Sequence, residues 1–184
     1  MAGTVGSGKS EWLNAAIAGL IHGNRPETLR LVLIDPKRVG FRRWRESAYL
    51  LEPILHHQEP ATAAFERLVE EMDDRYQSME QIGAEDWAHY MRRVSKPTPR
   101  IVCVCEEYAD LLAGDRVQRK SIEGLITRLG SKARAAGLQM ARDIESRMLL
   151  GSSGAENLLG QGDLLFKDLL EPVRLQGLWL DTGR

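Results

Sequence analysis

The sequence has little cysteine, almost no net charge and no long apolar run. Two cysteines cannot build a disulfide framework, and without a signal peptide or a long apolar run we expect a cytoplasmic chain with no membrane segment. A formal net charge of −1 does not by itself indicate a nucleic-acid partner. With 184 residues, 43% of them hydrophobic and 28% charged, the composition is that of a single globular domain, which we place at residues 1–184.

The two cysteines, Cys103 and Cys105, lie two positions apart in the apolar run R-I-V-C-V-C. That spacing puts both side chains on one face of a strand, because successive residues of a strand point to opposite faces. We therefore expect both to pack in the core. A metal site would need a second Cys or His pair at a suitable spacing, and the sequence offers none.

The chain opens M-A-G-T-V-G-S-G-K-S, which fits the phosphate-binding pattern G-x-x-x-x-G-K-[ST]. In this pattern the glycines let backbone N–H groups close around phosphate oxygens, the lysine reaches the terminal phosphates and the hydroxyl holds magnesium. A flexible Gly/Ser linker is the alternative interpretation. The candidate nucleotide-binding residues are Gly3, Thr4, Val5, Gly6, Ser7, Gly8, Lys9 and Ser10.

Behind this loop, apolar residues recur at helical spacing from Leu13 to Ile21, which predicts a helix whose amino end favours an anion and which ends at Gly23. Two later apolar runs predict buried strands: Leu31–Ile34, cut off by Pro36, and R-I-V-C-V-C. Further helices are expected at 62–79, at 84–94 and from Ile122 into S-K-A-R-A-A-G-L-Q-M. A capping box is expected at 153–156, and two strands on either side of Pro172.

Paired carboxylates, Glu106 and Glu107, follow the second predicted strand. In open parallel sheets ligands gather outside the carboxyl ends of the strands, so an acidic residue there can orient a magnesium shell and the next can polarise an attacking water. The alternative is that the two acids complement the dipole of a following helix. Glu106 and Ser10 are the candidate magnesium residues, and Glu107 is the candidate catalytic residue beside Glu106.

Six stretches, taken in order, resemble the motor domain of the FtsK/SpoIIIE family of DNA translocases: A-G-T-V-G-S-G-K-S, L-I-D-P-K, V-E-E-M-D-D-R-Y, C-E-E-Y-A-D-L, S-K-A-R-A-A-G and S-S-G-A-E-N-L-L-G-Q-G-D-L-L. The resemblance implies an α/β fold of the RecA-like P-loop NTPase type, with a mostly parallel sheet flanked by helices. It also implies ATP and Mg²⁺ as cofactors and ATP hydrolysis as the activity. Double-stranded DNA would be the partner, in chromosome segregation or DNA transfer, and the family assembles as a ring hexamer.

By the same resemblance, Lys9 and Ser10 are the phosphate and magnesium residues, and Glu106 and Glu107 are the acidic pair. Arg134, in the K-A-R-A-A-G stretch, would serve the site of a neighbouring subunit.

The chain departs from the family pattern in three places. Only Met1 and Ala2 precede the phosphate loop, so we expect the strand before it to be missing, and the family's Asp-Glu pair is here Glu106-Glu107. The added methylene moves the carboxylate by roughly 1.5 Å. The Thr-Gln-Arg-Pro sensor motif is absent, and we expect its strand to be missing too. Because the family's phosphate-loop strand lies between the acidic-pair strand and the sensor strand, such a chain would repack its sheet, borrow strands from a partner or be impaired in catalysis.

Other functions remain open from the sequence. A related secretion or conjugation ATPase is a close alternative, although the A-R-A-A-G and G-A-E-N-L-L-G stretches favour the chromosome-translocase branch. A non-catalytic nucleotide-binding remnant or interaction module would keep the phosphate loop without turnover. The segment F-R-R-W-R offers arginines for phosphate contacts, but a solvated loop with a half-buried Trp44 explains it equally well.

Overall fold

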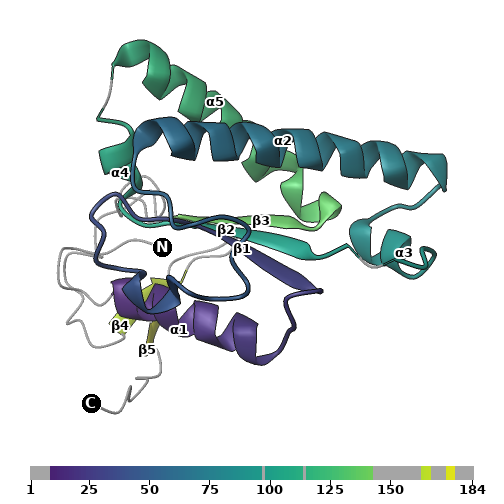
Figure 1. The fold of residues 1–184 in the computed structure, drawn as a ribbon, viewed down its shortest axis with the longest axis horizontal. Helices are drawn as coiled ribbons and strands as arrows, with labels where there is room; N and C mark the ends of the chain where they lie inside the picture. Colours follow the sequence, from purple (N-terminus) through teal and green to yellow (C-terminus); the bar gives the residue numbers. More distant parts are fainter. Residues whose placement is uncertain (1–8, 97, 114, 143–162, 167–172, 177–184) are drawn as a thin grey trace.

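The computed structural model describes residues 9–96, 98–113, 115–142, 163–166 and 173–176. Three parallel strands, helices on both faces and a separate antiparallel strand pair make up this part of the chain (Figure 1). The elements in chain order are α1 (Lys9–His22), β1 (Leu29–Ile34), η1 (Arg42–Trp44), α2 (Gln58–Gln81), α3 (Trp87–Met91), β2 (Arg100–Cys105), α4 (Tyr108–Leu111), α5 (Arg116–Lys132), η2 (Ala133–Ala136), β3 (Leu138–Arg142), β4 (Asp163–Phe166) and β5 (Val173–Gln176).

The two predicted apolar runs form neighbouring parallel strands in the sheet order β1-β2-β3. Leu29 pairs with Arg100 and Ile34 with Cys105, so the two strands end at the same edge of the sheet. Both are buried along almost their whole length, as expected for parallel strands covered on both faces. Cys103 and Cys105 are free thiols buried in the core, which confirms their predicted packing role.

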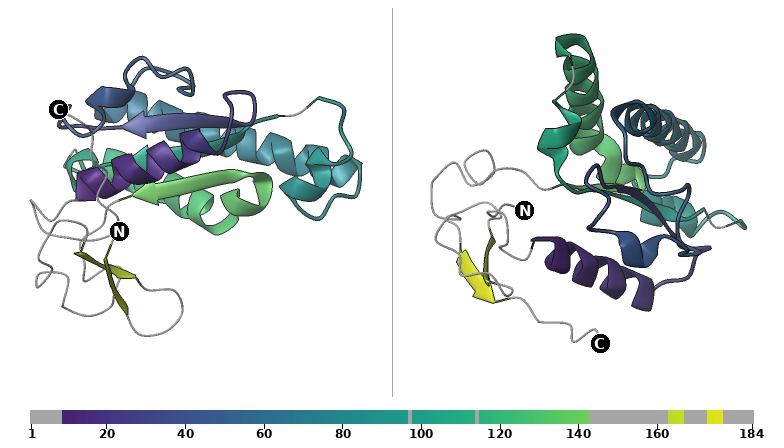
Figure 2. Two further views of the ribbon diagram at one scale, coloured as in Figure 1. Left: turned by 90° about the horizontal axis from the view of Figure 1, so that it is seen from below. Right: turned by 60° about the vertical axis from the view of Figure 1, so that its left-hand side comes forward.

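The two faces of the sheet are covered by different helices. Figures 1 and 2 show α1 on one face and the longer helices α2 and α5 on the other. On the first face, Leu13 and Ile17 of α1 share a core with Leu31, Leu33, Val102 and Val104. The hydrophobic core on the other face is larger and includes Phe65, Met72, Ile122, Ile126 and Leu129. No helix in the described part of the chain is long and apolar enough to cross a membrane.

The region after α5 differs from the sequence-based expectation. We predicted a helix running on through this stretch and no sensor strand, whereas the helix ends at Lys132, a short 3₁₀ turn follows, and Leu138–Arg142 form β3. Gly137, at φ +77°, reverses the chain there, a backbone angle that glycine adopts without steric cost. The strand is parallel to β2 and pairs with it directly from Ile101↔Leu138 to Cys105↔Arg142.

Strand β3 therefore occupies the position beside the acidic-pair strand that the family resemblance gives to the strand before the phosphate loop. In the described part of the chain no strand precedes α1. Within the described residues β3 lies directly beside β2, an arrangement that agrees with the first of the three outcomes suggested by the departures from the family pattern, a repacked sheet. The Thr-Gln-Arg-Pro motif itself is absent from the sequence.

Sequence reasoning missed Arg75, which ties α2 to the sheet and to η2. Its side chain is buried and donates hydrogen bonds from Nε to Glu71 Oε1 (2.7 Å), from Nη1 to the Ala136 carbonyl (3.1 Å) and from Nη2 to the Pro99 carbonyl (2.8 Å). The guanidinium also lies 4.2 Å from the centre of the Trp87 ring. Burial lowers the pKa of Arg75, and these contacts offset part of the cost of desolvating its charge.

The remaining helices and strands follow the predictions in part: α3 is shorter than the expected helix, α5 begins at Arg116 rather than at Ile122, and η1 and α4 were not predicted. The expected helices at 62–79 and 84–94 correspond to α2 and α3. The two strands predicted on either side of Pro172 are β4 and β5, which pair antiparallel from Asp163↔Gln176 to Phe166↔Val173. The capping box predicted at 153–156 lies outside the described residues.

Candidate functional site

The amino end of α1 and the carboxyl ends of β1 and β2 meet at one edge of the sheet. Ser10 lies in the first turn of α1, Asp35 follows β1 directly, and Glu106 follows β2. The Glu106 backbone N–H donates to the Ile34 carbonyl at 3.0 Å, which extends the strand pairing by one residue. Parallel pairing thus delivers two acidic side chains to the place where a helix begins, as expected for ligand sites in parallel sheets.

Ser10 and Glu106 are the two candidate magnesium residues, and their side chains meet. The Ser10 hydroxyl donates a hydrogen bond to Glu106 Oε1 across 96 positions of sequence. Glu106 is only 6% exposed, and a buried carboxylate is costly unless it is bonded. Two hard oxygen donors therefore converge at the amino end of a helix, where the dipole favours the phosphates that a magnesium ion accompanies.

Gly40 makes room for the longer acidic side chain at position 106. A Cβ built on Gly40 would lie 2.5 Å from Glu106 Cδ and 3.0 Å from Oε1, and closer still to Oε2. A side chain at position 40 would therefore overlap the carboxylate. The extra methylene of Glu106, which we identified as a departure from the family pattern, is accommodated by the absence of a side chain at Gly40.

Asp35 shapes the loop that contains Gly40. Its Oδ2 accepts hydrogen bonds from the backbone N–H groups of Gly40 (2.9 Å) and Phe41 (3.2 Å). Asp35 is 1% exposed, and its Oδ1 has no hydrogen-bond partner within the described part of the protein. The Asp35 and Glu106 carboxylates thus both lie against Gly40, and one buried acceptor on Asp35 is available.

Asn14 links α1 to the same loop and was not identified from the sequence. It is 2% exposed, and its Nδ2 donates to the Ser10 carbonyl (2.8 Å) and to the Gly40 carbonyl (3.0 Å). Its Oδ1 accepts from Trp44 Nε1 at 2.7 Å. A sequence signal existed: Asn14 lies four residues after Ser10 and three before Ile17, so a polar residue occupies the inward face of the helix.

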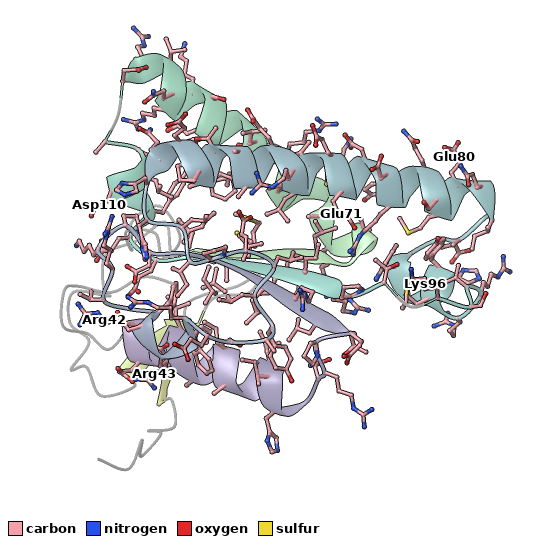
Figure 3. All side chains as sticks on the ribbon, in the orientation of Figure 1. Arg42, Arg43, Glu71, Glu80, Lys96 and Asp110 are labelled. Carbon is pink, nitrogen blue, oxygen red and sulfur yellow. The ribbon has the colours of Figure 1, made fainter. Side chains whose placement is uncertain are left out.

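Glu107, the candidate catalytic residue, has a left-handed backbone conformation with φ +52° and ψ +50°. It precedes α4, but its side chain makes no capping hydrogen bond to that helix. The carboxylate pairs instead with Lys37, whose Nζ lies 3.1 Å from Glu107 Oε1 and 3.9 Å from Asp110 Oδ2. Figure 3 shows Asp110 at the same end of the molecule as Arg42 and Arg43.

Arg134 does not join the acidic pair within the chain. It lies on η2, before β3, and β3 begins beside Ile101 at the amino end of β2. Glu106 follows the other end of β2, five residues further on, which corresponds to roughly 16 Å along a strand. Arg134 is exposed.

The remaining candidate nucleotide-binding residues belong to the phosphate loop. Gly3 to Gly8 lie outside the described residues, as does the side chain of Lys9. Within the described residues no three His, Cys, Asp or Glu side chains gather as a metal cluster. This is compatible with Mg²⁺, which usually takes one or two carboxylates together with water and substrate phosphates.

Burial raises the pKa of the Cys103 thiol to about 12, which keeps that cysteine protonated at neutral pH.

Comparison with known proteins places these features in a family context. The model of the FtsK/SpoIIIE family matches residues 1–96. The DNA translocase FtsK of Streptococcus pyogenes serotype M1 is 34% identical over 98% of this chain, and that of Streptococcus pneumoniae (strain ATCC BAA-255 / R6) is 33% identical over the same share. The chain spans only 27% and 28% of the length of these relatives. The alignments cover 220 positions against 184 residues here, so each relative has at least 36 residues without a counterpart.

Solved structures share the fold at lower identity. The pCW3 conjugation coupling protein TcpA, in its monomer form with ATPγS, superimposes with a TM-score of 0.79 at 21% identity, covering 95% of this chain and 58% of that one. The cytoplasmic domain of the type VII secretion ATPase EccC of Thermomonospora curvata gives 0.76 at 22% identity, covering 100% of this chain and 25% of that one. The predicted α/β fold of the RecA-like type is therefore confirmed.

Proposed function

Because the chain belongs to the FtsK/SpoIIIE family, we propose that it is an ATP-driven motor domain, spanning residues 1–184, that moves along double-stranded DNA. The observation that carries the proposal is the hydrogen bond between Ser10 and Glu106. It joins the end of the phosphate-loop motif to the acidic residue after β2, as a nucleotide site with bound magnesium requires.

In this proposal each residue of the site has one task. Backbone N–H groups of Gly3 to Ser10 hold the phosphates of ATP, and Lys9 reaches the terminal ones. Ser10 and Glu106 hold Mg²⁺, which when bound neutralises charge on the phosphate oxygens. Glu107 orients the attacking water and accepts its proton.

The side chains present fit a magnesium ion by their chemistry. The Ser10 hydroxyl and the Glu106 carboxylate are oxygen donors, and they already share a hydrogen bond. Asp35 adds a second buried carboxylate against Gly40, with one oxygen that has no hydrogen-bond partner in the described part of the protein. Oxygen ligands of this kind suit Mg²⁺ better than the softer transition metals.

Duplex DNA, a ring hexamer, a role for Arg134 in a neighbouring subunit and a cytoplasmic location are further parts of the proposal. They rest on the family and on relatives named as DNA translocases. The exposed position of Arg134, remote from the acidic pair of its own chain, supports a role between subunits.

One observation favours a second candidate function, a nucleotide-binding module without turnover. The acidic pair begins with Glu106 where the family has Asp, and misplacement of a catalytic group by about 1 Å can cost on the order of 100-fold in rate. Because Gly40 accommodates the longer side chain, we favour the active motor.

ATP hydrolysis by the full chain with Mg²⁺, measured with and without long duplex DNA, tests the proposal. We expect turnover that duplex DNA stimulates and that Lys9→Ala abolishes. Nucleotide binding that depends on Lys9, with no turnover under either condition, would establish the second candidate. Turnover that DNA does not affect would contradict the translocase.

A further inference from the structure

A strongly basic loop contacts the candidate site from the side. Residues 36–45, which we name the basic loop, contain five cationic side chains and no acidic one: Lys37, Arg38, Arg42, Arg43 and Arg45. All five are exposed. Figure 3 shows Arg42 and Arg43 at the same end of the molecule as Asp110, with Glu80 and Lys96 at the opposite end.

Besides the close approach of Gly40 to Glu106, two contacts join the basic loop to the groups proposed to act on ATP. Through Asn14, the Gly40 carbonyl and the Trp44 indole are connected to the Ser10 backbone. Through its ammonium group, Lys37 is connected to Glu107. The first contact reaches a residue that would hold the nucleotide, and the second reaches the residue that would activate water.

The contact between Lys37 and Glu107 restrains the catalytic carboxylate but can be exchanged. The Lys37 side chain is 46% exposed and that of Glu107 is 26% exposed. Ion pairs between solvent-accessible side chains contribute little to stability, so another anion can replace the carboxylate. Glu107 makes no capping hydrogen bond to α4, and its carboxylate pairs with the Lys37 ammonium, which also lies 3.9 Å from Asp110 Oδ2. Phosphate groups bound by the neighbouring arginines would compete with Glu107 for that ammonium group.

We propose that Lys37 is a positioning residue that restrains Glu107 until phosphates of duplex DNA, bound at the basic loop, compete for it. The inference rests on the proposed function, because it assumes that Glu107 activates water and that DNA is the partner. It supplies the link by which DNA binding stimulates hydrolysis. The Lys37–Glu107 ion pair and the binding of DNA phosphates compete for the same ammonium group, and such a coupling is reciprocal. Weakening the ion pair must therefore strengthen DNA binding.

This reciprocity gives a test that does not need turnover. The affinity for a long DNA duplex is measured at one fixed salt concentration for the full chain, for Glu107→Gln, for Lys37→Ala and for the double variant. We expect Glu107→Gln to tighten binding about two- to fivefold when Lys37 is present, which matches the range measured for exposed ion pairs. In the Lys37→Ala background the same change should have no effect.

Matched controls separate this coupling from a general charge effect. Glu80→Gln and Lys96→Ala make the same changes of charge at the far end of the molecule (Figure 3), and neither should alter the effect of Glu107→Gln. Lys37→Arg should restore the coupling, because arginine also pairs with a carboxylate. In the hydrolysis assay, Lys37→Ala should raise the DNA-independent kcat up to about fivefold without changing KM for ATP, and should reduce the stimulation by DNA.

Two results would overturn the inference, and they are distinguishable. Equal tightening by Glu107→Gln with and without Lys37 would show a general effect of charge, and it would leave the proposed function standing. A full chain that binds ATP but no duplex would refute the proposed function, and this inference with it.

Discussion

The replacement Gly40→Ala is expected to displace the carboxylate of Glu106. The new Cβ would lie 2.5 Å from Glu106 Cδ, whereas ordinary van der Waals contact begins near 3.4 Å. The carboxylate must therefore move by at least about 1 Å, or the loop must shift by as much, because Oε2 lies closer to the new Cβ than Cδ does. Such overpacking costs about 1–3 kcal/mol of stability, and a displacement of about 1 Å in a catalytic group costs on the order of 100-fold in rate.

A double-mutant cycle isolates this contact. Glu106→Asp shortens the acid by one methylene and makes room for a Cβ at position 40, so Gly40→Ala should cost less than about 1 kcal/mol in that background. Denaturant unfolding of the four proteins, followed by circular dichroism, measures the coupling if the slope m stays constant. Gly19→Ala is the matched control: a Cβ there meets nothing within 4 Å, and alanine at that position in α1 should stabilise the chain by up to about 1 kcal/mol. An equal loss from Gly40→Ala in both backgrounds would refute the reasoning.

The other predictions concern stability. Arg75→Met should lower the free energy of unfolding by about 3 kcal/mol in denaturant, because two backbone carbonyls lose their donor, while Glu71→Gln should cost less than about 1 kcal/mol. Gly137→Ala should lower the melting temperature, since its φ is +77° and the Cβ would lie within 2.7 Å of Trp87 Nε1; an unchanged value would contradict this packing. Burial raises the pKa of Cys103 from 9.0 to about 12, so the folded chain keeps a proton that the unfolded chain releases above about pH 9. Between about pH 9 and pH 12 the free energy of unfolding should therefore fall by up to about 1.4 kcal/mol per pH unit. Cys103→Ala should make the free energy of unfolding less dependent on pH in this range.

Two of the three parallel strands could be predicted because each is recognisable from its own local sequence. The runs that became β1 and β2 are continuous, apolar and ended by Pro36 or by the acidic pair, so no distant contact is needed to recognise them. Strand β3 was missed because L-Q-M-A-R is not an apolar run, and its pairing with β2 decides its conformation. Arg75 was missed for a related reason: on a charged helix face, only its distant partners Pro99 and Ala136 distinguish a buried arginine from a solvated one.

In the candidate site, too, the features given by local sequence could be predicted, and those that depend on distant contacts could not. The spacing of the phosphate loop and the rule on carboxyl ends of parallel strands were enough to place Ser10 and Glu106 together. Neither rule indicates that Gly40 lies against Glu106 or that Lys37 pairs with Glu107, because both contacts depend on the path of the basic loop. That path is fixed by the Asp35 carboxylate, which accepts a hydrogen bond from the Gly40 N–H, and by the Asn14 amide, which donates one to the Gly40 carbonyl; the two residues are separated by 21 positions.

The central claim is that a nucleotide and its magnesium ion bind where Ser10 and Glu106 meet, and calorimetric titration of ATPγS tests it most directly. The full chain and Ser10→Ala are each titrated with Mg²⁺ and with a chelator in its place. We predict that Mg²⁺ tightens binding to the full chain by at least about tenfold and that Ser10→Ala loses this gain, as expected for a charge-assisted contact. Affinity that is the same with and without Mg²⁺, in both proteins, would contradict the account.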